Sequence, residues 1–173
     1  MSQSISDTLS LLVSWYEEPS ISDERARLLS KLAVLELCGW LEGTFDDVVL
    51  EVDREALADE PWVRKTVIAH VHGFHYEKHL RPMLNQLLGE IVVRRIEARV
   101  NSDAPGDLDQ FKSLLGALWK ARCDFAHADM VANVATQQTF NAPSWSRKQH
   151  ASLSRLIGTF QTHLRAEMQR FVN

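Results

Sequence analysis

Apolar residues recur at three- and four-residue intervals through most of this sequence, and no other feature constrains the fold as much. The clearest run follows a Ser-Asp-Glu start signal at Ser22 and reaches Trp40, and its spacing is typical of one face of a helix. Gly and Pro number only seven and five among 173 residues, too few for a turn-rich sandwich of short strands. The sequence therefore predicts an all-α fold, a single-domain bundle of about five to six helices over residues 1–173.

Start and stop signals divide the periodic pattern into separate helices. Pro82 predicts a break or kink between two of them, whereas the segment from Thr44 to Leu57 is compatible with either a short strand or further helix. In the run that ends at Trp40, the expected packing face consists of Leu28, Leu29, Leu32, Leu35 and Trp40. The expected helices are Ser4–Tyr16, Ser22 through Trp40, Glu60 to about Leu80, Met83 to about Val100, Asp107 to the end of RCDFAH, and Ser146 to Phe171, with loops at NSDAPGD and between 130 and 146.

The net charge of −4 conceals two oppositely charged parts of the chain. Residues 1–60 contain four basic and fourteen acidic side chains, whereas residues 61–173 contain fifteen basic and nine acidic ones. The first part therefore carries −10 and the second +6. Because binding of a polyanion such as a nucleic acid depends on a cationic surface, we expect any such ligand to approach the part of the protein built after residue 60.

Cysteine spacing and hydropathy indicate the compartment. Cys38 and Cys123 are 85 positions apart and form no CxxC motif, which fits a reducing cytosol and no cysteine metal site. No stretch approaches the roughly 18 consecutive apolar residues of a membrane span, and the N-terminus lacks a basic segment followed by an apolar one. We expect a cytoplasmic protein with no membrane association and no cofactor.

The segment RCDFAH contains the residues best suited to chemistry. Arg122 supplies a permanent cation that can bind a phosphate through two hydrogen bonds, and His127 can accept or donate a proton near neutral pH. These groups suffice to cleave RNA at a ribose 2′-hydroxyl without a metal ion. Five residues on a helix rotate by about 140°, so a shared site needs a helix break near Ala126 or a second subunit. The alternative is a surface arginine and a histidine favoured by the helix C-terminus.

This motif, together with an early helix that contains LELCGWLEGTFDD, resembles the HEPN superfamily of helical domains, which occur in prokaryotic toxins and antiphage systems. The resemblance covers most of the chain and depends on the all-α pattern and the Arg-x4-His spacing. It implies a homodimer in which two such motifs face each other. The implied activity is that of a metal-independent endoribonuclease, a hydrolase. The implied role is in a toxin–antitoxin pair or in phage defence. Arg122 and His127 carry over as the catalytic residues.

Two further positions follow from the resemblance. The residue after the arginine is commonly Asn, Asp or His in this family, whereas here it is Cys123, with Asp124 one place later as a supporting residue. Some HEPN domains are non-catalytic and bind a nucleotide or a partner protein, an alternative that Cys123 favours. An early acidic residue often accompanies the motif; Glu36 and Glu42 lie about 120° apart on their helix, so at most one, Glu36 in our prediction, faces a shared cleft. The alternative for each is a solvated carboxylate.

Four of the seven histidines fall within ten residues. On the expected helix, His72, His75 and His79 lie within one stripe, where imidazoles can bind Zn²⁺ or Ni²⁺, although three ligands from one helix seldom complete a tetrahedral site and no HExxH motif is present. A second interpretation places Tyr76, His79 and Arg81 beside a nucleotide cleft. A third is an interface or half-buried helix face.

A cluster of arginines follows at the end of the next predicted helix. Arg95 and Arg99 share a face and are candidates for phosphate binding, the alternative being a solvated surface. The leading hypothesis is thus a dimeric ribonuclease that acts on RNA, with an antitoxin or another protein as a further partner. The alternatives are a non-catalytic nucleotide- or protein-binding module and a helical protein that binds metal through the histidine cluster.

Overall fold

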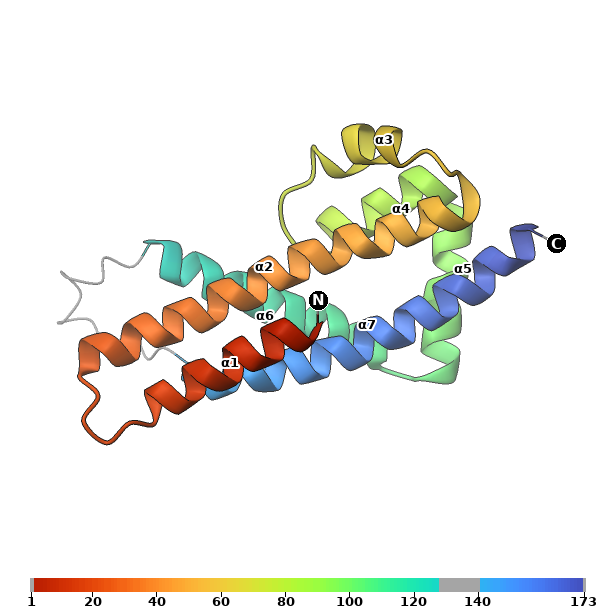
Figure 1. Ribbon diagram of the computed structural model, residues 1–173. Helices are drawn as coiled ribbons and strands as arrows, with labels where there is room; N and C mark the ends of the chain where they lie inside the picture. Colours follow the sequence, from red (N-terminus) through yellow and green to blue (C-terminus); the bar gives the residue numbers. More distant parts are fainter. Residues whose placement is uncertain (1, 128–140, 173) are drawn as a thin grey trace. The chain divides into compact units, whose positions relative to one another are not determined.

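A computed structural model describes residues 2–127 and 141–172 of the chain (Figure 1). All regular secondary structure in these residues is helical, so the prediction of an all-α bundle is confirmed. Seven α-helices and two π-helical segments occur in them: α1 (Ser2–Tyr16), α2 (Asp23–Ala56), α3 (Glu60–Val63), η1 (Arg64–Ile68), η2 (Tyr76–Leu80), α4 (Arg81–Leu88), α5 (Glu90–Asp103), α6 (Asp107–His127) and α7 (Pro143–Val172).

The described residues form two compact units. The first unit lies within Met1–Trp40 and Ala117–Ser152, and the second within Leu41–Gly116 and Leu153–Asn173. Helices α2, α6 and α7 each contribute residues to both units. That the chain forms one domain stays a prediction.

Helix α2 is 34 residues long and settles the segment whose structure the sequence left open. Its second half stays helical (Figure 1), because Phe45, Val48 and Val52 repeat at three- and four-residue spacing and are all buried. Just after its end, the Asp59 backbone N–H donates a hydrogen bond to the carboxylate of Asp53, which lies in the last turn of the helix (2.9 Å). Neither α2 nor any other helix in the described ranges is long and apolar enough to cross a membrane.

The expected helix from Glu60 to about Leu80 is wrong. Its start is correct, since α3 begins at Glu60 with a proline in its first turn, but regular structure stops at Ile68 and resumes only with η2. In the interval, Gly73 adopts a φ of 131°, which residues other than glycine rarely adopt. The His79 ring lies where a Cβ of residue 73 would be. A continuous helix cannot pass through that conformation.

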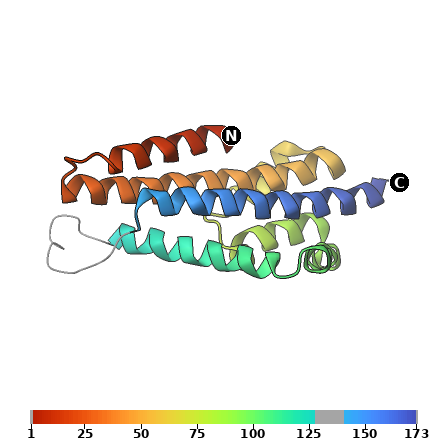
Figure 2. The same ribbon diagram turned by 90° about the horizontal axis from the view of Figure 1, so that it is seen from below.

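The expected helix from Met83 to Val100 is divided at Gly89. This glycine has a φ of 81° and ends α4, after which α5 runs in a different direction (Figures 1 and 2). Pro82 does not end the helical run, since η2 and α4 are contiguous at Leu80 and Arg81 and Pro82 lies in the first turn of α4. Helix α5 extends to Asp103, three residues into the expected NSDAPGD loop.

Each unit has an apolar core of its own. In the first unit, α1 packs on α2 through Ile5, Leu9, Leu12, Leu29 and Ala33. In the second unit, the buried Tyr76 ring meets Phe111 and Phe160 edge to face, with ring centres 5.9 and 6.1 Å apart. Such aromatic pairs contribute about 0.5–1.5 kcal/mol beyond their burial.

The predicted packing face of α2 is correct only in part. Leu29 is buried, but Leu28, Leu32 and Leu35 are 50%, 40% and 39% exposed. The buried row instead includes Ala33, Val34 and Leu37, which lie outside the predicted face. Two overlapping apolar rows occur on this helix, and the apolar pattern alone did not show which row faces the core.

Two glycine substitutions should change stability in opposite directions. At Gly73, a Cβ would lie 2.6 Å from Cε1 of His79, and the positive φ is strained for alanine, so Gly73→Ala should lower the free energy of unfolding by about 1–3 kcal/mol. At Gly158 in α7, a Cβ meets nothing within 4 Å, so Gly158→Ala should raise it by about 1 kcal/mol. Urea unfolding of both variants checks this, and equal effects would contradict it.

Candidate functional site

Arg122 lies near the end of α6 and is partly buried. Its guanidinium carbon is 5.6 Å from the centre of the Trp119 ring, which is close enough for a cation–π interaction. This contact restrains the arginine against its own helix. Cys123 is a partly buried free thiol, and Asp124 forms an ion pair with Lys120 one turn earlier (3.2 Å).

His127 is the last residue of α6, and its side chain lies outside the described residues. The backbone is helical through Ala126 to His127, so the first of the two alternatives, a helix break near Ala126, is excluded. Positions 122 and 127 therefore lie about 140° apart around the helix axis. A shared Arg–His site therefore requires a second subunit, which contributes one of the two residues.

The two early acidic candidates belong to different units. Glu36 is exposed on α2 in the first unit, which also contains Arg122, and its side chain forms no ion pair within the described part of the chain. Glu42 is partly buried and belongs to the second unit. Glu36 is thus the acidic candidate that shares a unit with Arg122.

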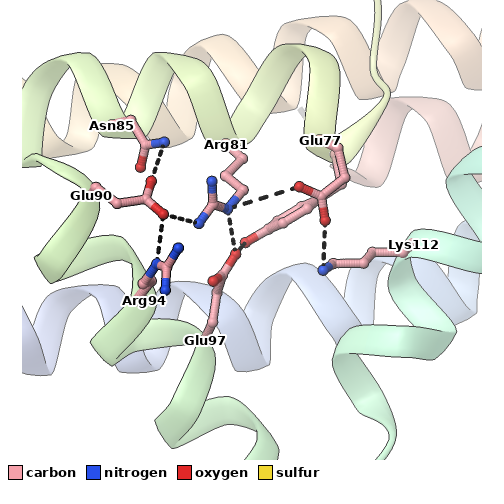
Figure 3. Close-up of polar contacts among 8 residues, drawn as sticks. Glu77, Arg81, Asn85, Glu90, Arg94, Glu97 and Lys112 are labelled. Atoms are coloured by element: carbon pink, nitrogen blue, oxygen red, sulfur yellow. Dashed lines mark hydrogen bonds and ion pairs between the residues drawn. The ribbon is translucent and has the colours of Figure 1, made fainter.

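Arg81 is the centre of a polar network in the second unit (Figure 3). Its Nε donates to Glu97 (2.9 Å) and its Nη2 donates to Glu90 (2.7 Å). The Tyr76 hydroxyl donates to the same Glu97 oxygen (2.9 Å), so the structure places Tyr76 in the core and not on an open cleft. The network is completed by Glu77, Asn85, Arg94 and Lys112.

These contacts shift the pKa values of three groups in the network. Hydrogen bonds from Arg81 and Arg94 lower the pKa of Glu90 to about 2, so the stability that Glu90 contributes is present above its ordinary pKa and lost as pH falls toward 2. The hydrogen bonds that Arg81 donates to Glu90 and Glu97 raise the pKa of Arg81 above its usual value. Burial, and then the Glu97 carboxylate, raise the pKa of Tyr76, which keeps its hydroxyl a donor.

The two arginines predicted to bind phosphate hold a buried carboxylate. Glu167 of α7 is 0% exposed, and its two oxygens lie 2.6 Å from Arg95 Nη1 and 2.5 Å from Arg99 Nη1. Both arginines do share a face of α5 that meets this carboxylate, but their side chains remain 50% and 26% exposed. Their first role is therefore to neutralise Glu167, and phosphate binding by them stays a prediction.

The prediction that His72, His75 and His79 lie along one helix is wrong. Only His79 is in a helical segment, and the other two precede η2 in irregular backbone. The Nδ1 of His79 accepts a hydrogen bond from the backbone N–H of His75 (2.8 Å), so this atom is not free to bind a metal. Within the described ranges, no group of three or more His, Cys, Asp or Glu is placed to hold a metal ion. A metal site at this cluster was suggested by three histidines in one stripe of a helix, and the structure does not contain that arrangement.

Stability should depend on pH through His79. Burial, followed by His75 and Lys78, lowers the pKa of His79, whereas Glu42 acts in the opposite direction. Because the unfolded chain binds this proton more readily, the stabilisation is complete above about pH 6.5 and is lost as pH falls through the folded-state pKa. In urea unfolding between about pH 4 and pH 8, His79→Gln should lose part of this dependence. The control His70→Gln alters an exposed histidine and should keep the contribution of His79, and equal profiles for the two variants would contradict the assignment.

Most cationic side chains after residue 60 are already paired. Ten of the fifteen form ion pairs with Asp or Glu in the described part of the chain. Arg147 and Lys148, near the start of α7, are exposed and form none there, and they belong to the same unit as Arg122. The cationic surface available to RNA is therefore narrower than the charge of +6 indicates.

Two carboxylates around which the arginines gather, Glu90 and Glu167, were not among the predicted site residues. The pair of Glu90 with Arg94 has a local signal, since residues four apart on a helix are neighbours. Glu167 meets Arg95 across 72 positions of the chain, and no spacing rule indicates such a contact. Near Glu167 the sequence shows only an acidic residue in an amphipathic helix, and it does not show that this residue is buried.

Comparison with protein-family models, with curated proteins and with solved structures finds no match to this chain. Its function must therefore be inferred from its own residues and contacts.

Proposed function

We propose that this protein is a metal-independent endoribonuclease of the HEPN type that acts as a cytoplasmic homodimer in a toxin–antitoxin or phage-defence system. One observation carries the proposal. The Arg-x4-His segment ends α6, with Arg122 partly buried and restrained by Trp119 and with His127 at the last helical position. A restrained guanidinium loses little freedom when it binds a phosphate, which favours binding.

The proposed reaction needs only these two residue types. His127 removes the proton of a ribose 2′-hydroxyl, and the oxygen attacks the adjacent phosphorus. The bond from phosphorus to the 5′-oxygen of the next nucleotide breaks, and that oxygen takes up the proton that His127 has received from the 2′-hydroxyl. The products are a 2′,3′-cyclic phosphate and a 5′-hydroxyl end, and Arg122 stabilises the charge that develops on the phosphate.

The continuous helix determines how such a site would be assembled. Because positions 122 and 127 are about 140° apart, each site takes Arg122 from one subunit and His127 from the other. Arg147 and Lys148, exposed in the same unit as Arg122, supply further contacts to the RNA backbone. Loss of these two charges should weaken RNA binding and reduce its dependence on salt.

The proposal is tested with purified protein and a total RNA preparation in the presence of EDTA. The wild type should cleave RNA, and Arg122→Ala and His127→Ala should each reduce the rate by about 100-fold or more. Arg94→Ala, which removes an exposed arginine of the second unit, should cleave like the wild type. Absence of cleavage by the wild type contradicts the proposal, activity that EDTA abolishes indicates a metal enzyme, and equal activity in all variants indicates a contaminating nuclease.

Mixing the two inactive variants tests the shared site. After subunit exchange, half of the dimers contain one Arg122→Ala chain and one His127→Ala chain, and each such dimer has one intact site if the residues come from different subunits. The mixture should therefore regain about a quarter of the wild-type activity. If the residues act within one subunit, mixing restores nothing.

One observation favours the non-catalytic alternative. The residue after Arg122 is Cys123, and the next carboxylate along the chain, Asp124, is engaged by Lys120. In that case the unit binds a nucleotide or a partner protein through Arg122 without cleaving RNA. Binding of RNA or mononucleotides that Arg122→Ala abolishes, together with no cleavage by the wild type, would support this function in place of the first.

A further inference from the structure

Exposed apolar side chains are concentrated on two helices of the first unit. Of the eight large apolar side chains that are exposed in the described part of the chain, five lie on α1 and the first half of α2. Three of them, Leu28, Leu32 and Leu35, follow one line along α2. Gly39 continues the line, and nothing lies within 4 Å of the place where its Cβ would be. We call these four positions the leucine stripe.

The core of the first unit does not use the leucine stripe. On α2, the side chains that meet α1 are Leu29 and Ala33, about 100° around the helix from the stripe. A single exposed leucine is ordinary in a folded protein. A regular row of them over three turns is typical of a helix surface that packs against another helix.

The spacing of the leucine stripe identifies the kind of helix that fits it. Intervals of four, three and four residues are those of positions d, a, d and a in a coiled coil, where two helices meet along one seam. Small residues at the seam allow two backbones to approach closely, and Gly39 occupies the last of these positions. The partner is therefore a helix with the same periodicity, and α2 itself satisfies this condition.

The charges beside the leucine stripe are complementary between two copies of α2. Lys31 occupies position g on one side of the seam and Glu36 occupies position e on the other, and neither forms an ion pair in the described ranges. In a parallel pair, position g meets position e of the following heptad in the partner, so Lys31 meets Glu36 of the partner subunit on both sides. An antiparallel pair brings like positions together and places equal charges side by side.

We propose that the leucine stripe is a homodimer interface in which two copies of α2 pack in parallel about a two-fold axis, flanked by two Lys31–Glu36 ion pairs. The two-fold axis makes both ion pairs equivalent. This inference depends on the surface of α2 and not on RNA cleavage, and it does not assume that the same interface brings Arg122 and His127 together. Because the seam covers only three turns, we expect a dissociation constant on the order of micromolar.

Light scattering and sedimentation of the full chain test the interface. Between about 1 and 200 µM, the wild type should pass from its monomer mass of 19.7 kDa to twice that mass. The double variant Leu32→Glu, Leu35→Glu should remain monomeric, with its dissociation constant raised at least about 100-fold. Ile91→Glu, which alters a 75% exposed apolar residue on α5, should dimerise like the wild type. Far-ultraviolet circular dichroism verifies that each variant is folded.

Charge exchange tests the parallel orientation. Lys31→Glu and Glu36→Lys alone each place two like charges across the seam and should weaken the dimer, whereas the double exchange should restore it. An equimolar mixture of the two single variants should form a heterodimer with both ion pairs intact.

Three results would overturn the proposal. A wild type that is monomeric at the highest concentration excludes the interface, since the stripe would then be unoccupied or used by another protein. A dimer that the leucine variants leave intact lies elsewhere on the molecule. Dimers that respond to the leucine variants, but not to the charge exchanges, contradict the parallel arrangement. None of these outcomes depends on RNA cleavage, so they separate failure of this interface from failure of the ribonuclease proposal.

Discussion

Replacing both Arg95 and Arg99 with methionine should lower the free energy of unfolding by about 3–5 kcal/mol. The replacement removes the two closest positive charges from the carboxylate of the fully buried Glu167. The remaining cation, Arg170, is 3.6 Å away and is itself 62% exposed. A buried carboxylate without a close cation must either stay charged in a poor environment or take up a proton. Urea unfolding at neutral pH measures the loss.

The same contact predicts an asymmetry between the two sides of the ion pair. Glu167→Met should cost less, about 1–2 kcal/mol, because the arginines reach solvent and can be hydrated once the carboxylate is gone. The triple methionine variant should recover much of the stability lost in the arginine double variant. As a control, Glu60→Ala removes the exposed pair with Arg64 and should change stability by no more than about 0.5 kcal/mol. Equal losses for Glu167→Met and the arginine double variant would contradict this explanation.

The second large effect is expected at Tyr76, which is 1% exposed and joins the aromatic core of the second unit to the polar network around Arg81. Tyr76→Ala should destabilise the protein by about 3–5 kcal/mol, since it removes a large buried ring and its contacts with Phe111 and Phe160. Tyr76→Phe keeps the ring and removes only the bond to Glu97, so it should cost about 1–2 kcal/mol.

The pH dependence distinguishes the hydroxyl from the ring. Because the folded-state pKa of Tyr76 is raised above 10, the unfolded chain loses this proton first, and stability falls as pH rises beyond about 10. Tyr76→Phe should remove this part of the alkaline loss. Unfolding measured between about pH 8 and pH 11 tests the assignment, and an identical slope in the phenylalanine variant would argue against it.

These expectations bear on the interpretation of nuclease assays. Arg95 and Arg99 were phosphate-binding candidates, but they also neutralise Glu167, so a loss of activity on their removal would mix folding with function. Arg147 and Lys148 are exposed without ion pairs in the described residues, and they allow phosphate binding to be tested with less risk to the fold.

Some features were predictable because their causes are local. Helices α1, α6 and α7 begin or end within a few residues of their predicted limits, since periodicity and capping signals operate over three or four residues. The start of α3 at Glu60 was correct for the same reason. The continuous helix through RCDFAH followed from the apolar spacing before it, and its persistence to His127 excluded one of the two ways of forming the candidate site.

Other features were not predictable, because they depend on contacts between distant parts of the chain. The break at Gly73 involves the His79 ring, and a glycine in a sequence does not show which sign its φ will take. The exposure of Leu32 beside the buried Ala33 depends on where α1 packs.

The sequence by itself determined that this chain is helical and where α1, α6 and α7 lie, because helix formation responds to spacing and capping within a few residues. It also supplied the arginine and histidine of the proposed catalytic segment. The tertiary structure decided which apolar residues are buried and which carboxylates the arginines meet, because burial and ion pairing depend on residues as far apart as Arg95 and Glu167. It therefore placed Arg95 and Arg99 against Glu167 and left the leucine stripe of α2 exposed.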